Sequence, residues 1–177
     1  VNSAVAFGGF APSVVRRVEE FDGTSWSNAG DMNNSRAKTS AAGDSENSGL
    51  AISGYNPTQL TCTEHYDGLN WSEGGALITH RKAGGSGGSE NAAFSVAGGS
   101  TTSEEYDGSS WTAGNNLTSA RYKGYGSGTQ TAAITVGGNL SPGITNKTEL
   151  WNGTGWTEVN NLNTTRYYNP TAGTTTA

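Results

Sequence analysis

Cysteine occurs once in the chain, as Cys62, so a disulfide framework is excluded and the fold depends on packing and hydrogen bonds. Charged residues are also few, at 14% of the chain, and the net charge is −5. The lysines and arginines are scattered, whereas a nucleic-acid site needs them clustered to neutralise phosphates. No apolar run approaches the roughly 18 residues of a membrane-spanning helix. The sequence therefore predicts neither nucleic-acid binding nor membrane insertion.

Histidine is almost as rare as cysteine, since the chain has only His65 and His80. A metal site needs three or four convergent ligands, and these residues do not provide them. The glycine-rich run at 84–88 is not followed by a helical pattern, so a phosphate-binding loop is not expected either. We therefore predict no metal and no other cofactor.

Glycine, by contrast, is abundant. Adding its 27 residues to the hydrophobic 32% brings the apolar share to about 47%, within the usual range of roughly 45–50%. Serine, threonine and asparagine make up much of the remainder, and no stretch shows helical periodicity over about 11 residues. This composition is typical of a single all-β domain with many turns.

One pattern occurs four times along the chain: Glu, any residue, an aromatic, Asp or Asn, Gly, two residues, Trp, and an Arg ten residues later. Its members are Glu19, Glu64, Glu104 and Glu149, then Trp26, Trp71, Trp111 and Trp156, then Arg36, Arg81, Arg121 and Arg166. The Trp and the Arg both recur in steps of 45, 40 and 45 residues. A fixed period of about 40–50 residues with strand-like content indicates the blades of a propeller.

Each unit is expected to form four short strands. A strand of small residues follows the Arg, as in 38–43, and an apolar strand ending in glycine comes next, as in 49–54. The third strand carries the Glu and the aromatic residue, and the fourth carries the Trp. The Asp-Gly or Asn-Gly between the last two strands indicates a tight hairpin, because both turn positions favour positive φ.

The ends of the chain fit the same pattern, since residues 1–9 match the second strand and residues 166–177 match the first. Joining the ends gives a step of 47 residues, close to the other three. We therefore predict an all-β fold, a β-propeller of four blades of four antiparallel strands. Pairing of the N- and C-terminal strands would close the ring and remove free sheet edges. The predicted single domain, 1–177, has blades 166–177 plus 1–35, 36–80, 81–120 and 121–165.

Two alternatives to a closed four-blade ring stay open: the chain is part of a larger propeller, or two chains share one ring.

The double glycine, the aromatic-Asp before the hairpin, the Trp and the following Arg together resemble the kelch repeat. The double glycine is intact at Gly8-Gly9, Gly98-Gly99 and Gly137-Gly138, and becomes Ser53-Gly54 in one unit. The repeat sequence is rich in Gly, Asn and Thr, as in 106–117, and in this respect it is similar to kelch-type propellers of marine bacteriophages and environmental bacteria. This resemblance implies a virion or cell-surface location, with other virion or surface proteins and a host glycan as partners. Homo-oligomerisation stays open.

The repeated residues are interpreted as structural. The Glu and Arg are expected to form buried ion pairs that join the third strand of one blade to the first strand of the next. The four Trp are expected to pack between blades rather than to stack on sugars. A catalytic site needs carboxylates in distinct environments, whereas a repeat gives all its carboxylates the same one. The chain is therefore predicted not to be an enzyme.

Ligand binding is expected instead on the loops between the second and third strands, which vary in length between units. The long loops cover 10–18, 55–63 and 139–148, and their candidate ligand-binding residues are Tyr55, Asn56, Gln59, Asn139 and Lys147. We predict a structural or binding module that recognises a glycan or a protein through this face. The alternative is a polysaccharide hydrolase or lyase, which would need a non-repeated acidic pair in a cleft.

Overall fold

The computed structural model describes residues 3–140 and 143–173, which form strands, turns and irregular segments with no helix among them. Within these residues there is accordingly no helix that could cross a membrane. The all-β prediction is therefore confirmed for the described part of the chain.

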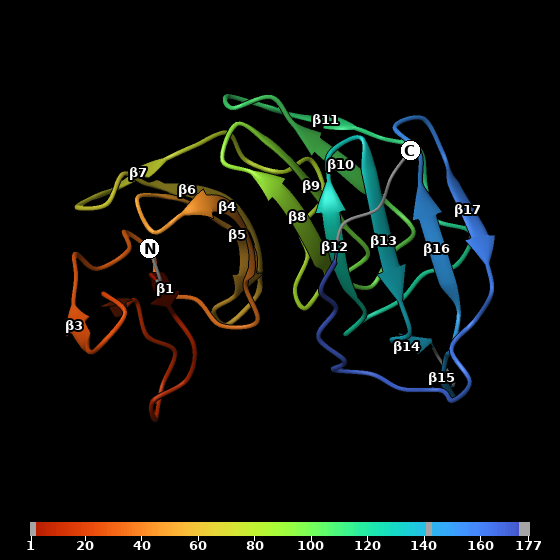
Figure 1. The fold of residues 1–177 in the computed structure, drawn as a ribbon, viewed down its shortest axis with the longest axis horizontal. Helices are drawn as coiled ribbons and strands as arrows, with labels where there is room; N and C mark the ends of the chain where they lie inside the picture. Colours follow the sequence, from red (N-terminus) through yellow and green to blue (C-terminus); the bar gives the residue numbers. More distant parts are fainter. Residues whose placement is uncertain (1–2, 141–142, 174–177) are drawn as a thin grey trace.

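Each sequence unit folds into one antiparallel sheet whose strands follow one another in space as they do along the chain (Figure 1). The first sheet has three strands, β1 (Ala4–Phe7), β2 (Val18–Phe21) and β3 (Trp26–Asn28). The second has β4 (Ser40–Ser45), β5 (Ser48–Tyr55), β6 (Gln59–Tyr66) and β7 (Trp71–Glu73). The third has β8 (Gly85–Ser89), β9 (Ala92–Val96), β10 (Ser103–Tyr106) and β11 (Trp111–Ala113). The fourth has β12 (Tyr125–Thr129), β13 (Ala132–Val136), β16 (Thr148–Trp151) and β17 (Trp156–Val159), and a small hairpin of β14 (Asn139–Leu140) and β15 (Gly143–Ile144) extends its long loop.

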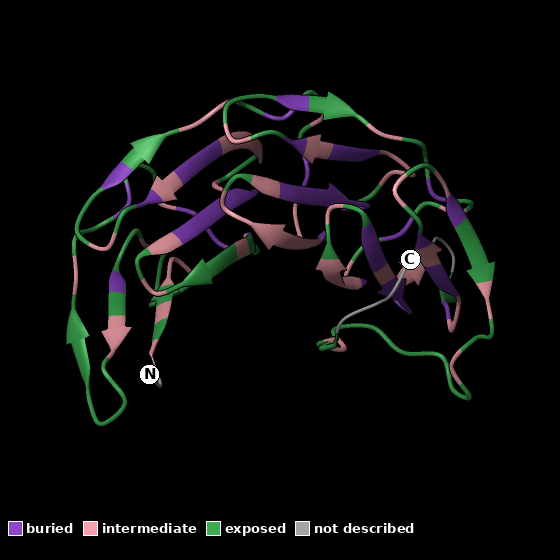
Figure 2. Ribbon diagram, turned by 45° about the horizontal axis from the view of Figure 1, so that its top comes forward, coloured by how far each residue is buried: buried purple, intermediate pink, exposed green. Residues whose placement is uncertain are grey.

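The four sheets lie side by side in an open arc (Figures 1 and 2). The first strand of each complete sheet lies on the concave side, where β4 contacts β8 and β8 contacts β12. This close approach requires glycine: a Cβ on Gly85 would lie 2.7 Å from the backbone nitrogen of Gly126, and one on Gly87 would lie 2.8 Å from the carbonyl oxygen of Gly128. The small-residue strands noted in the sequence are therefore the inner strands of the arc.

The predicted closure of the ring is wrong for the described residues. Strand β1 pairs only with β2, so the first sheet has three strands instead of four. The segment 166–173 lies along the fourth sheet, where the Tyr168 N–H donates to the carbonyl of Lys123 at 3.0 Å and the Ser127 hydroxyl donates to the carbonyl of Gly173 at 2.7 Å. The segment 166–173 is thus bonded to the strand β12 region much as β12 is bonded to β8, and it does not pair with the first sheet. The remaining residues of the two predicted closing strands, 1–2 and 174–177, lie outside the described part.

Three hydrophobic clusters fill the spaces between neighbouring sheets (Figure 2 shows the buried residues in purple). The middle cluster shows the composition that they share. The second sheet supplies Leu50 and Ile52 from β5 and Leu77 from the following connection, and the third sheet supplies Tyr106 and Trp111. The repeated Trp side chains therefore pack between sheets, as expected, at three of the four positions, with Trp71, Trp111 and Trp156 exposed by only 7%, 5% and 8%.

The Asp-Gly hairpins form, but the prediction that both turn positions have positive φ is wrong. Only the glycine has a positive φ, as at Gly68, and the preceding Asp caps the turn with its side chain. One Asp67 carboxylate oxygen accepts the backbone N–H groups of Leu69 and Asn70 at 2.9 and 2.7 Å. In the fourth unit an asparagine, Asn152, accepts the corresponding two bonds with its side-chain carbonyl. The turn therefore needs a side-chain acceptor at this position, which Asp and Asn both supply.

The repeated Arg and Glu form buried ion pairs at three positions: Arg36 with Glu64, Arg81 with Glu104, and Arg121 with Glu149. Both partners of each pair are at most 1% exposed. Each Arg pairs with the Glu that follows it by 28, 23 and 28 residues, not with the Glu before it. The prediction of buried pairs is confirmed at these positions, while the predicted direction of pairing is wrong.

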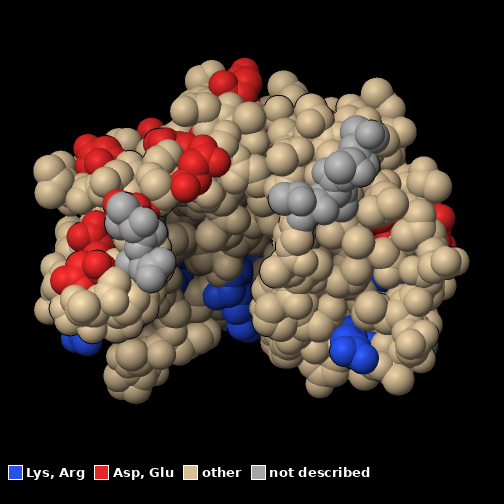
Figure 3. Space-filling view, in the orientation of Figure 1, with Lys and Arg blue, Asp and Glu red and all other residues tan. Residues whose placement is uncertain are grey.

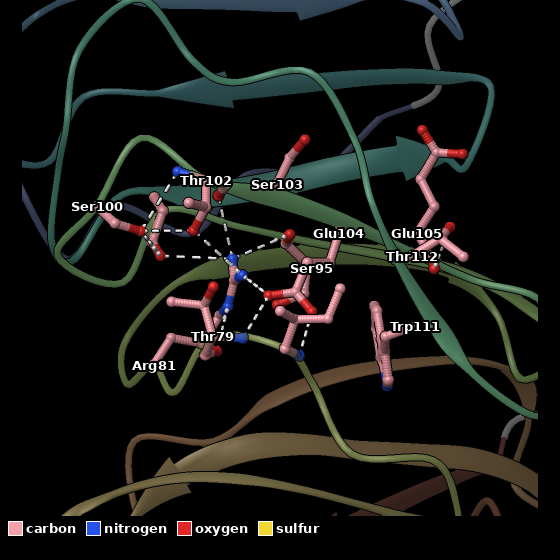
Figure 4. Close-up of polar contacts among 12 residues, drawn as sticks. Thr79, Arg81, Ser95, Ser100, Thr102, Ser103, Glu104, Glu105, Trp111 and Thr112 are labelled. Atoms are coloured by element: carbon pink, nitrogen blue, oxygen red, sulfur yellow. Dashed lines mark hydrogen bonds and ion pairs between the residues drawn. The ribbon is translucent and has the colours of Figure 1, made fainter.

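The structure explains this direction by the way each Arg spans two sheets. The carbonyl of Arg81 accepts the N–H of Gly54 in the second sheet, whereas its guanidinium donates to Glu104 and to the carbonyls of Ser95 and Thr102 in the third sheet, the last two at 3.1 and 3.2 Å (Figure 4). Glu104 in turn accepts two backbone N–H groups of the connection that precedes Arg81, at 2.7 and 3.0 Å. Backbone and side chain of one residue thus hold neighbouring sheets together.

The pairs at the two ends of the arc are absent. Glu19 and Arg166 are exposed, and among the described residues neither forms an ion pair. Trp26 is likewise 51% exposed. Both terminal sheets therefore present repeat residues that are buried elsewhere in the chain.

Replacing Arg81 with Met is expected to lower the free energy of unfolding by on the order of 3 kcal/mol, because Glu104 would keep its charge in a buried site without its cation. Denaturant unfolding followed by circular dichroism measures this change. The double variant Arg81→Met, Glu104→Leu should recover part of the loss, since it removes both charges. An unfolding midpoint that does not move in the single variant would contradict the assignment.

The hairpin aspartates should make the fold sensitive to acid. Hydrogen bonds from the Thr24 hydroxyl and the neighbouring backbone N–H groups lower the pKa of Asp22 to about 2, and backbone N–H groups lower the pKa values of Asp67 and Asp107 as well. A depressed pKa in the folded state means stabilisation above the ordinary pKa of about 4, which is lost as the pH falls through the folded value. A variant with all three aspartates changed to Asn keeps the acceptors, as Asn152 does. Its unfolding free energy should therefore fall less than that of the wild type between about pH 4 and about pH 2; equal pH profiles would contradict this account.

Candidate functional site

The two ends of the sheets differ in charge. The hairpins within each sheet, such as 45–48 and 66–71, lie at one end, which we call the hairpin end; the connections between sheets and the long loops lie at the other, the loop end. Carboxylates gather over the hairpin end, whereas the visible Lys and Arg atoms lie towards the loop end, some of them in the hollow on the concave side (Figure 3). A net negative chain thus has a basic region where its inner strands begin.

Four residues in the left-handed backbone conformation form a row across the concave side at the loop end. They are Lys38, Ala83, Lys123 and Tyr168, with φ of 54°, 52°, 57° and 53°, and each stands two positions after a repeated Arg. Their backbones form a ladder, in which Ala83 donates to Lys38 at 2.9 Å, Lys123 to Ala83 at 2.8 Å and Tyr168 to Lys123 at 3.0 Å. Left-handed non-glycine residues are uncommon and often occur at functional sites. Here they bring residues from four repeats into one row.

Lysine and tyrosine side chains cluster along this row. The ammonium groups of Lys38 and Lys82 lie 5.0 and 4.7 Å from the centre of the Tyr55 ring. The ammonium group of Lys123 lies 5.1 and 4.7 Å from the rings of Tyr167 and Tyr168. These six residues are named the lysine–tyrosine rim: Lys38, Lys82, Lys123, Tyr55, Tyr167 and Tyr168.

The cations of the rim are held by aromatic faces and not by carboxylates. Among the described residues, none of the three lysines lies within ion-pairing distance of an Asp or Glu. Cation–π contacts keep an ammonium group in place without neutralising it. The rim therefore offers positive charge and aromatic surface to an incoming ligand.

The structure separates the sequence-predicted ligand residues into two groups. Tyr55 belongs to the rim, and Asn56 and Gln59 adjoin it on the same loop, where the Asn56 amide donates to the hydroxyl of Ser35 at 2.7 Å. Asn139 begins the β14 hairpin of the fourth sheet and pairs through its backbone with Tyr122. Lys147, which directly precedes β16, donates to Glu158 at 2.8 Å. Asn139 and Lys147 are thus not part of the rim.

The sequence reasoning missed the three lysines of the rim. A signal was present, because a lysine stands one or two residues after three of the four repeated arginines, in Arg36-Ala37-Lys38, Arg81-Lys82 and Arg121-Tyr122-Lys123. These positions lie on connections that precede the inner strands, outside the long loops on which ligand binding was expected.

The concave wall next to the rim consists mainly of small residues. A cavity of about 360 Å³ there is lined mainly by glycine, serine and alanine of the inner strands, together with Val5 and Phe7. Such a wall offers backbone and hydroxyl groups but no titratable side chain.

A second cleft, of about 520 Å³, lies at the hairpin end between the second and third sheets. In it, His65 Nδ1 lies 2.8 Å from a carboxylate oxygen of Glu90, and His65 Nε2 lies 2.8 Å from the Tyr106 hydroxyl. Burial raises the pKa of Tyr106, so its hydroxyl stays neutral at physiological pH. The Tyr66 hydroxyl makes the equivalent contact with Glu20, at 2.6 Å, one unit earlier. We therefore assign the Tyr106 bond to His65 as a contact between sheets.

Among the described residues, no three His, Cys, Asp or Glu side chains are placed so that they could hold a metal ion together. The thiol of Cys62 is half-buried, and burial raises its pKa, which disfavours the reactive thiolate.

No protein-family model and no curated protein matches the chain. Among the solved structures that match is one titled "Structure of YjhT", with a TM-score of 0.68 and 16% sequence identity. The match covers 82% of this chain and 52% of that one, so the chain spans about half the length of the structure that it resembles. At this identity the similarity concerns the fold alone.

Proposed function

We propose that the chain is a non-enzymatic binding module of kelch-type propeller architecture, which recognises an anionic glycan at its loop end. The architecture is supported by the four repeats, the sheets arranged in an arc and the likeness in fold to the YjhT structure. On the resemblance to phage and surface kelch-like proteins, we place this recognition on a virion or a cell surface.

The lysine–tyrosine rim is the observation that carries the proposal. Three lysines without carboxylate partners suit the carboxylate or sulfate groups of an acidic sugar polymer. The faces of Tyr55, Tyr167 and Tyr168 suit the apolar faces of sugar rings. Asn56 and Gln59, from the sequence-predicted set, extend this surface with amide groups for hydroxyls.

Binding of polygalacturonate and dextran sulfate, with neutral dextran as the reference polymer, tests this function. The variant Lys38→Gln, Lys82→Gln should bind the anionic polymers about fivefold more weakly, since two exposed charge contacts together contribute on the order of 1 kcal/mol. Added salt should weaken wild-type binding, because exposed charges are screened. Isothermal titration calorimetry gives both values.

The matched control is Arg16→Gln, Arg17→Gln, which removes the same charge from two exposed residues of the first sheet. It should bind as the wild type does. Equal losses in both double variants would show that only net charge matters, and wild-type binding to neutral dextran alone would overturn the anionic assignment.

A polysaccharide hydrolase or lyase is the second candidate, favoured by the cleft that contains His65, Glu73 and Glu90. Unlike the repeated Glu, these carboxylates occupy positions that are not shared by all units. The same polymers incubated with the protein and analysed for shortened or unsaturated chains distinguish the two functions. Cleavage by the wild type that is lost in the variant Glu90→Gln would show that the chain is an enzyme and not a binding module.

A further inference from the structure

The two ends of the arc carry the two halves of the joint that links neighbouring sheets. In every internal joint the earlier sheet contributes two apolar residues of one strand (β1, β5 or β9), a Met or Leu of the connection, and the backbone of the Arg. The later sheet contributes an aromatic residue, the Trp and the Glu. The connection residues are Met32, Leu77 and Leu117, all at most 4% exposed.

The first sheet presents the later half of such a joint, and no described residue of the chain occupies the place of the earlier half. Phe21 and Trp26 stack at 5.3 Å in the same way as Tyr66 and Trp71, which stack at 4.8 Å. Yet Trp26 is 51% exposed, whereas Trp71 packs at 5.1 Å against Phe7 of the preceding sheet. Glu19, at the position of the buried glutamates, is exposed beside them.

The fourth sheet presents the earlier half. Ile134 and Leu162 stand at the positions of Leu50 and Leu77 and are only half-buried. The Arg166 backbone is docked as in the other units, since its carbonyl accepts the Gly138 N–H at 2.8 Å, but its side chain is exposed.

The backbone of the same connection adds further donors. The N–H groups of Asn163 and Thr164 stand where those of Ile78 and Thr79 donate to Glu104. Neither has an acceptor among the described residues. The fourth sheet thus offers a guanidinium and two backbone donors for one carboxylate.

We propose that the first sheet of a second copy of this chain docks on the fourth sheet, head to tail. Glu19 of one copy then accepts from Arg166 and the two backbone donors of the other, while Trp26 and Phe21 cover Ile134 and Leu162. The proposal commits to a second copy because both halves occur on this chain, are opposite in charge, and repeat an interface that the chain already contains three times. Both ends of the arc face the same side (Figure 2), so two copies related by a twofold axis close a ring through two equal joints.

Charge reversal in two separate chains tests this joint. The variants Glu19→Arg and Arg166→Glu should each weaken association by at least about tenfold, because each places like charges in the joint. Mixed in equal amounts, they should associate as the wild type does, since the hetero-pair restores an Arg–Glu contact at both joints. Light scattering after size-exclusion chromatography and native mass spectrometry, with the two variants of different mass, measure both results.

The control Glu73→Arg makes the same charge change at an exposed position on β7 and should leave the dimer intact. A second variant, Trp26→Thr, should weaken association while retaining the circular dichroism spectrum of the folded chain, because Trp26 is exposed in the single copy. A monomeric wild type, or a dimer that Glu19→Arg leaves unchanged, overturns the proposal. So does a monomer that is destabilised by Glu19→Arg and not restored in the mixture, which would show that the arc closes on itself.

Discussion

The buried arginine that precedes each inner strand is the interaction on which the arrangement of the sheets depends. Its carbonyl is bonded to one sheet and its guanidinium to the next, so the two sheets cannot shift without breaking a charged contact. A buried ion pair gives little net stability when complete, but removal of one partner is costly. The main effect of the pair is thus to fix the position of one sheet relative to the next. Its repetition fixes the angle between successive sheets, and this angle gives the arc.

Packing and backbone contacts follow from that placement. The aromatic pairs fill the space that the ion pairs leave on the outer side, and glycines allow the inner strands to approach on the concave side. Where the inner strands begin, the backbone ladder holds one residue of each repeat in the left-handed conformation. Lysine at two of these positions, and at a third beside them, turns a structural row into a charged surface with aromatic support.

The features of the fold that the repeat determines could be predicted from the sequence. The closure of the ring, which depends on how the two ends of the chain are placed, could not. The strand content, the packing of Trp71, Trp111 and Trp156 and the burial of three Arg–Glu pairs follow from periodicity alone. The direction of pairing did not, because Glu64 has an Arg on either side in the sequence and only the three-dimensional structure selects Arg36. Closure failed because matching repeat lengths do not determine whether residues 166–173 turn towards β1 or follow β12.

The candidate site was predictable only in part, for a similar reason. Tyr55 was predicted because it lies on one of the long loops, which vary in length between units. Lys38, Lys82 and Lys123 are far apart in the sequence and become neighbours only through the contacts between β4, β8 and β12. Scattered lysines give no sign of clustering until the curvature of the arc is known.

The exposed Trp26 has a consequence for the order in which the structure opens. In a linear array, each sheet is stabilised by its own strands and by the neighbours on its two sides. The first sheet has three strands, only one neighbour and an outer aromatic pair in contact with solvent, so its amide protons should exchange with deuterated solvent sooner than those of the second and third sheets. Opening should then proceed inward from this end, and any partner that covers Trp26 would convert the least protected sheet into an interior one.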